Sequence, residues 1–261
     1  MTPAILTTAE VTSWVGGFFW PLVRISSIFI LTPVIGARYV PMRIRMAAAM
    51  MITLVIAPTL DPAPAVTPWS ADGVLITAQQ LLIGIGLGLL LQFIFGAVTL
   101  AGMSISTSMG LAMAMMTDPQ NGTSVPVVGQ FLTTLASLLF LVFDGHLALI
   151  ELIGVSFTYL PIGPHGPGPE GLQLVIEASS VIFMAAISLA LPAMMTLLSI
   201  NILLGVMTRV SPQMNIFSVG LPLTLFVGLV ILLVTLPVLT PTFERLMDEA
   251  FVSMRGYLQV P

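Results

Sequence analysis

Long apolar runs separated by short polar connectors fill almost the whole chain. The runs cover six regions, which are 11–35, 46–60, 74–103, 127–160, 172–207 and 216–240. A helix needs about 20 mainly apolar residues to cross a bilayer, so region 46–60 is short for a span. The pattern predicts an all-α integral membrane protein whose helices form hairpins.

Two of these regions, 127–160 and 172–207, are too long for one span and are expected to be broken. The letters FDGH at 143–146 interrupt the first, and Pro192 interrupts the second. Proline inside a helix removes a hydrogen bond and clashes with the preceding turn. We therefore expect broken and kinked helices. Some of them need not cross the bilayer if the chain is enclosed in a larger assembly, because a helix surrounded by protein is as apolar as one in lipid.

The connectors indicate an orientation in the membrane. Segments 61–73 and 161–171 are rich in proline and glycine and are predicted loops. If six segments alternate, the connectors on one side carry four arginines, namely Arg38, Arg43, Arg45 and Arg209. The other side carries only Arg245 and Arg255. The positive-inside rule then places the connectors with four arginines in the cytoplasm.

Composition strengthens the membrane assignment. Hydrophobic residues make up 57% of the chain and charged residues 7%, whereas soluble domains carry about 25% charged residues. Cysteine is absent, which excludes disulfides, thiol catalysis and cysteine-ligated metals. The few basic residues argue against a nucleic-acid partner. Because no basic segment precedes the first apolar run, we expect no cleaved signal peptide.

The sequence contains no recognisable enzyme motif. The glycines of GIGLG at 84–88 do not fit the dinucleotide pattern G-x-G-x-x-G, and Gly84 and Gly88 have the G-x-x-x-G spacing of packed membrane helices. The only histidines, His146 and His165, lie too far apart in sequence to suggest a metal site. We expect no catalysis, no metal and no cofactor.

Ionisable side chains inside apolar runs leave an alternative open. Such groups are costly in lipid and are functional by default, and here they are Arg24, Asp144, Glu151 and Glu177. A proton-coupled secondary transporter could use Asp144, His146 and Glu151. In the other interpretation these groups lie at helix ends or pair with another subunit, and Gly145 after Asp144 suits a helix break. No internal repeat typical of transporters is visible.

Methionine is concentrated in the segment 108–122, which holds Met109, Met113, Met115 and Met116 before Asp118 and Pro119. Methionine is unbranched and polarizable and fills irregular gaps. One interpretation is a helix end packed against a neighbour. The other is a deformable apolar plug that seals a pore.

The tail at 241–260 has the pattern of an amphipathic helix. Its apolar positions recur at near-helical spacing, at Phe243, Met247, Ala250, Met254 and Leu258. We expect this helix to lie on a membrane or on a partner.

Several strings in order along the chain resemble one family. They are FFWPLVR (18–24), MITLVIAP (51–58), QQLLIGIGLGLLLQF (79–93), MGLAMAMMTDP (109–119), LLFLVFDGHL (138–147), LPIG (160–163) and RVSPQMNIFSVGLPLTL (209–225). Over nearly its whole length the chain is similar to the FliR/SctT-type export-gate family of type III secretion. The strings favour the flagellar members over the equivalent subunit of a virulence system.

The resemblance implies a helical, pore-forming assembly in the bacterial inner membrane, within the flagellar basal body. The family combines five copies of a FliP-like subunit, four of a small two-helix FliQ-like subunit and one chain of this type. FlhB-like and FlhA-like proteins are further expected partners, and unfolded flagellar subunits are the cargo. Driven by a separate ATPase and the proton motive force, they cross the opened gate.

The resemblance also divides the chain into two parts. Residues 1–165 are similar to the FliP-like subunit and contain the pore plug at 106–122, and 166–261 are similar to the FliQ-like hairpin and add the tail. The plug residues are then Met109, Gly110, Met113, Met115, Met116, Asp118 and Pro119. Relatives often carry aromatic residues in this segment, where this chain carries methionine.

The same resemblance makes 209–215 the tip of a C-terminal hairpin. Pro212 ends one helix, and the side chain of Asn215 can cap the next. Arg209 lies near a helix C-terminus, where positive charge is favoured. The expected assembly residues at this tip are Arg209, Pro212, Gln213, Asn215, Gly220 and Pro222.

Overall fold

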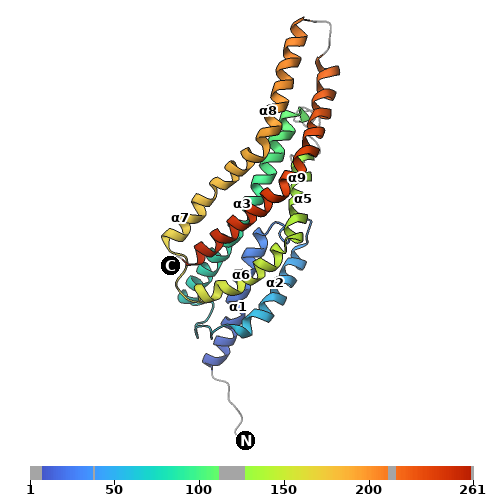
Figure 1. Cartoon of the computed structure of the whole chain (residues 1–261). Coiled ribbons are helices and arrows are strands. Elements are labelled where there is room, and N and C mark those ends of the chain that lie inside the picture. Colours follow the sequence, from blue (N-terminus) through green and yellow to red (C-terminus); the bar gives the residue numbers. More distant parts are fainter. Residues whose placement is uncertain (1–7, 38, 112–126, 211–215, 260–261) are drawn as a thin grey trace. The chain divides into compact units, whose positions relative to one another are not determined.

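The computed structural model describes residues 8–37, 39–111, 127–210 and 216–259, in which no strand occurs (Figure 1). A short 3₁₀ turn, Ala57–Thr59, follows the second helix. The α-helices are α1 (Thr8–Leu31), α2 (Met42–Ile56), α3 (Ala71–Ser108), α5 (Val127–Val142), α6 (Gly145–Tyr159), α7 (Pro169–Ala178), α8 (Ser180–Val210) and α9 (Ile216–Gln259). The predicted all-α class is confirmed.

Five of the described helical stretches are long and apolar enough to cross a membrane. They are Thr12–Leu31, Met42–Thr59, Ala71–Ser108, Pro169–Val210 and Gly220–Gln259. Region 46–60, short in the sequence, becomes 18 residues because the helix begins at Met42. Helix α3 has 38 residues, or about 57 Å at 1.5 Å per residue, against a hydrocarbon core of about 30 Å. An untilted α3 therefore extends beyond the lipid.

The predicted break at 143–146 is confirmed. Helix α5 ends at Val142, α6 begins at Gly145, and their axes differ by 66°. Asp144 lies between them with φ 54°, in the left-handed region. Non-glycine residues seldom adopt this conformation, and Asp is among those that do so more readily.

The prediction that Pro192 interrupts its helix is wrong. Helix α8 continues through Pro192, and the chain instead breaks at Ser179, between α7 and α8. A proline removes one donor from the helical ladder, and local side chains can hold the surrounding turns. Here the hydroxyl of Thr196 donates to the Pro192 carbonyl at 2.9 Å.

The tail is also different from its prediction. It is the last part of α9, which continues through Pro237 and Pro241. All five apolar positions of the predicted amphipathic face are buried within the chain: Phe243, Met247, Ala250, Met254 and Leu258. The expectation that this face lies on a membrane or another protein is therefore wrong, because the chain itself covers it.

The chain forms two compact units, each assembled from separated segments. The first unit comprises Met1–Gln92, Asp144–Ser179 and Glu249–Pro261, and the second comprises Phe93–Phe143 and Ser180–Asp248. The predicted division at residues 165 and 166 concerns similarity to two other proteins, which compactness does not test. It stays a prediction.

Glycines allow close helix packing in the first unit. A Cβ placed on Gly84 would lie 2.6 Å from the carbonyl oxygen of Arg24, and one on Gly88 would lie 2.7 Å from Cβ of Leu31, both in α1. Gly86 touches the ring of Tyr257 in α9, whose hydroxyl donates to the Leu82 carbonyl at 3.0 Å. The structure thus places all three glycines of GIGLG in helix contacts.

In the second unit, α3 and α5 cross almost backbone to backbone. A Cβ on Gly102 would lie 2.5 Å from Cα of Gly129, and the hydroxyls of Thr99 and Thr133 are hydrogen-bonded at 2.8 Å. Aromatic contacts continue this core. The ring of Phe95 meets Phe140 and Phe243 edge to face, with centroids 5.9 and 5.7 Å away.

Candidate functional site

The end of α3 is the described part of the predicted plug. Met109 is 1% exposed, and Gly110 has φ +83°, which favours glycine. Five other predicted plug residues lie outside the described residues: Met113, Met115, Met116, Asp118 and Pro119.

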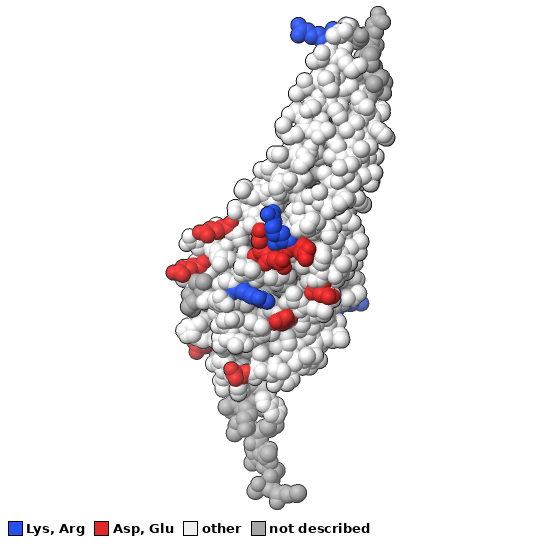
Figure 2. Space-filling view, in the orientation of Figure 1, with Lys and Arg blue, Asp and Glu red and all other residues white. Residues whose placement is uncertain are grey.

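The hairpin in the second unit is formed by α8 and the first part of α9, which run side by side in opposite directions (Figure 1). From Ser180 to Phe243 the sequence has one charged residue, Arg209. Figure 2 shows the visible face of the hairpin as nearly uncharged along its length. Large apolar side chains are exposed on both helices, including Met184 at 73% and Val234 at 70%. Apolar surface of this extent is typical of contact with lipid or other proteins.

The predicted tip residues fall at both sides of the hairpin turn. Arg209 is exposed in the last turn of α8. Gly220 and Pro222 belong to the beginning of α9, where Gly220 is buried and Pro222 exposed. Three further tip residues lie outside the described part of the chain: Pro212, Gln213 and Asn215.

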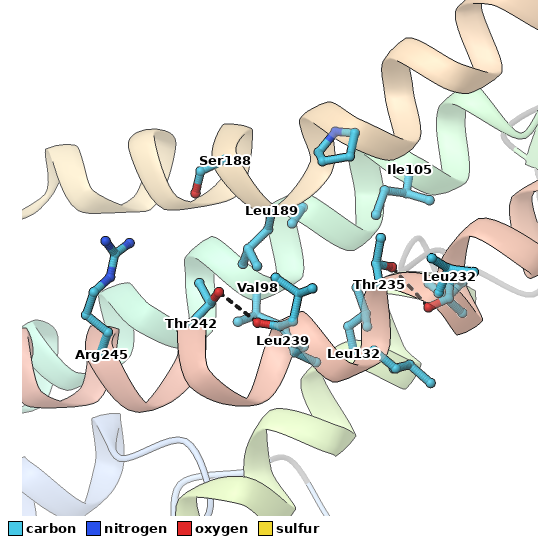
Figure 3. Close-up of a pocket in the computed structure, with 15 residues that line it drawn as sticks. Val98, Ile105, Leu132, Ser188, Leu189, Leu232, Thr235, Leu239, Thr242 and Arg245 are labelled. Carbon is cyan, nitrogen blue, oxygen red and sulfur yellow. Dashed lines mark hydrogen bonds between the residues drawn. The ribbon is translucent and has the colours of Figure 1, made fainter.

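A cleft of about 350 Å³ lies in the second unit between α3, α5, α8 and α9 (Figure 3). Ser188 and Leu189 extend from α8, opposite Leu239 and Thr242 of α9, and Arg245 lies at one end. The hydroxyls do not converge on the space. Thr242 donates to the carbonyl of Val238 in its own helix at 2.8 Å, and Ser188 donates to that of Ala185 at 2.9 Å. The cleft is therefore essentially apolar and has no arrangement suited to acid–base chemistry.

Arg24 is the most strongly bonded side chain in the first unit, although the sequence indicated no role for it. It is fully buried in α1 and bonds to α3 and to the end of α6. Its Nε donates to Gln80 Oε1 at 2.8 Å, its Nη1 to the carbonyl and hydroxyl oxygens of Ser156 at 2.9 and 3.1 Å, and its Nη2 to the Leu160 carbonyl at 2.7 Å. The guanidinium carbon lies 4.1 Å from the ring centroid of Phe157.

These contacts give Arg24 a physical role at the end of α6. The last carbonyls of a helix have no partner within it, and positive charge is favoured at this end. Arg24 supplies both donors and charge, and it thereby joins three helices. An arginine inside an apolar run was the available sequence signal, but its partners are up to 136 residues away in the chain.

The residues of the transporter alternative do not form a relay. Asp144 and Glu151 are exposed, and Nδ1 of His146 is buried without a hydrogen-bond partner. Within the described ranges, no group of three or more His, Cys, Asp or Glu side chains could hold a metal ion.

Comparison with known proteins identifies the family. The description "Bacterial export proteins, family 1" matches residues 15–250. The flagellar biosynthetic protein FliR of Escherichia coli K12 is 40% identical over 246 residues, which cover 94% of each chain. FliR of Pectobacterium carotovorum is 42% identical over 93% of this chain and 92% of its own. FliR of Bacillus subtilis 168 is 31% identical over 92% and 94%.

These matches extend across both compact units and agree with the apolar helices of the structure. The chain therefore belongs to the bacterial export proteins, family 1, the family of the flagellar biosynthetic FliR proteins.

Proposed function

We propose that this chain is a subunit of the flagellar type III protein export gate in the bacterial inner membrane. The observation that carries the proposal is the 40% identity to a flagellar biosynthetic protein over 94% of both chains. The structure supports a role in transport, because it has long apolar helices and an apolar cleft in place of a polar reaction site.

The finer proposal is that the chain helps to form and plug the export pore of the flagellar basal body. The segment after α3 would be the plug, and unfolded flagellar subunits would pass when it is displaced. In support, Met109 and Gly110 end α3 beside a hairpin with a single charge. An apolar surround of this kind can exclude water and ions from a closed pore.

The expected partners are FliP-like and FliQ-like subunits, with one copy of this chain in the complex, and FlhB-like and FlhA-like export proteins. The exposed apolar side chains of α8 and α9 support such partners, since a complex would cover them. The tip around Arg209, Pro212, Gln213 and Asn215 is proposed as a contact with neighbouring hairpins.

The test is purification of the tagged chain from its own host in a mild detergent, followed by the mass of the intact complex. We expect co-purification of two other small membrane proteins in unequal amounts. Deletion of the chromosomal copy should abolish secretion of flagellar subunits. A stable homodimer that transports a solute in liposomes would instead support the transporter alternative.

Replacing Met113, Met115 and Met116 with alanine is expected to make the assembled complex leak small ions. In a packed core each truncation costs about 2–5 kcal/mol, and a deformable plug should lose its seal before the protein unfolds. The measurement is ion or dye uptake by cells that express the variant with its partners. Full assembly with no more uptake than the parent would show that these methionines are ordinary packing residues.

The variant Arg209→Glu is expected to lower the yield of the complex and swimming motility, with little change in the amount of the chain itself. A negative charge at the C-terminal end of α8 is unfavourable there and reverses any contact with a partner. Arg255→Glu, also exposed on a helix, is the control for charge alone. Normal yield and motility would leave the tip with a capping role only.

A further inference from the structure

The C-terminal end of α3 is held by a partner in α9. The amide of Met109 donates to the Ile105 carbonyl at 2.9 Å, and that of Gly110 to the Thr107 carbonyl at 3.0 Å. Gly110 then leaves the helix with φ +83°, as glycine commonly does just after a helix end. The carbonyl of Met109 is one of the last helix carbonyls, which lack a partner within the helix.

Thr224 supplies that partner. Its hydroxyl lies 3.1 Å from the Met109 carbonyl oxygen and 3.0 Å from the Leu221 carbonyl oxygen, so one proton is within reach of both acceptors. Thr224 is 5% exposed. Because water has little access, the bond to Met109 has no ready replacement.

Gly228, one helical turn further along α9, makes room for the Met109 side chain. A Cβ on Gly228 would lie 2.5, 2.6 and 2.8 Å from Cγ, Cε and Sδ of Met109. The absence of a side chain at residue 228 therefore creates the space that Met109 fills. Gly110 adds a further contact, because a Cβ there would lie 3.0 Å from Cδ1 of Leu221.

We propose that Thr224 and Gly228 are positioning residues that anchor Met109, and with it the start of the segment 110–122, to the C-terminal hairpin. The proposal deepens the proposed function, because it rests on that segment being the plug. Its content is a physical connection between two parts that the family resemblance treats separately. A displacement of α9 along its axis would change the position at which the segment leaves α3.

Two substitutions separate the space from the hydrogen bond. Gly228→Val fills the space under Met109, and Thr224→Val keeps the side-chain shape but removes the hydroxyl. The matched controls are Gly205→Val in α8, where nothing lies within 4 Å of an added Cβ, and Thr235→Val, whose hydroxyl bonds only to carbonyls of its own helix.

Amide hydrogen exchange of the peptide that contains residues 105–110, measured on the purified complex, reads the anchor directly. We expect exchange at least tenfold faster in Gly228→Val and Thr224→Val, and unchanged exchange in both controls. Because Thr224→Val preserves shape, it keeps the test decisive if Gly228→Val fails to fold. Unchanged exchange in Thr224→Val would overturn the proposal.

Ion uptake by cells expressing the same variants tests the plug separately. Faster exchange with increased uptake supports both the anchor and the plug. Faster exchange with parental uptake retains the anchor and contradicts the sealing role of the segment.

Discussion

Arg24→Met is expected to destabilise the first compact unit by several kcal/mol. The methionine fills much of the space but donates nothing, so Gln80 Oε1 and the Leu160 carbonyl lose their bonds to Arg24. Gln80 would then make no hydrogen bond, because its Nε2 already lacks a partner. Each buried acceptor left without a donor costs about 1–3 kcal/mol. A sum of about 2–6 kcal/mol is comparable with the total stability of many domains.

The removal of a buried cation has an opposite effect, which must be weighed. Exchanging a whole buried ionic group and its partners for apolar residues can be neutral or stabilising, whereas removing one partner is strongly destabilising. The double variant Arg24→Met with Gln80→Leu should therefore recover part of the loss. Arg24→Lys should be intermediate, since an ammonium cannot reproduce the planar fork of donors that reaches α3 and α6.

The measurement is the fraction of tagged chain that stays monodisperse on size exclusion after graded heating of the detergent-purified complex. For a protein of this size about 1 kcal/mol corresponds to about 2–4 °C in the midpoint. Arg255→Met, at an exposed position of α9 in the same unit, is the control and should match the parent. An Arg24→Met protein that melts with the parent would show that the network contributes little.

Gly84→Ala is expected to separate α3 from α1. The new Cβ would lie 1.8 Å from the Ser27 hydroxyl oxygen and 2.6 Å from the Arg24 carbonyl oxygen. The hydroxyl can rotate away, but the carbonyl belongs to the helix backbone and cannot move alone. Overpacking of this kind costs about 1–3 kcal/mol, and the displaced turn is the one that carries Arg24.

The same heating assay checks this prediction. Gly154→Ala is the matched control, since Gly154 lies inside α6 with nothing within 4 Å of an added Cβ. It should be neutral or stabilising, because alanine favours a helix over glycine by about 0.5–1 kcal/mol. Equal midpoints for the Gly84 and Gly154 variants would exclude a tight crossing at Gly84.

The hydrophobic pattern was sufficient for the fold class and for the break at Asp144, because both depend on local sequence. A polar Asp-Gly pair inside an apolar run is a strong local signal. Pro192 misled because the cost of one lost hydrogen bond is small beside the apolar contacts of a 31-residue helix. The tail misled for another reason: amphipathic spacing shows that a face will be covered, but it does not identify what covers it.

The site was less predictable because its contacts are distant in sequence. Arg24 was recognisable as an unusual charge, yet its bond to Leu160 spans 136 residues. The contact between Met109 and Thr224 spans 115 residues, and no periodicity reports it. Gly228 could not be distinguished from other helical glycines by sequence alone, since Gly205 in the same hairpin faces open space.

The nearly charge-free hairpin of α8 and α9 has a thermodynamic consequence for assembly. A newly made copy keeps these side chains in hydrocarbon before it meets other subunits. Joining a complex then exchanges one apolar surround for another, so release of ordered water contributes little along these faces. Association must instead be selected by shape, by close packing at small residues and by a few hydrogen bonds. We therefore expect the fit of the hairpin surfaces to limit affinity more than their hydrophobicity does, so an apolar residue of the wrong shape would weaken assembly even though it remained equally soluble in lipid.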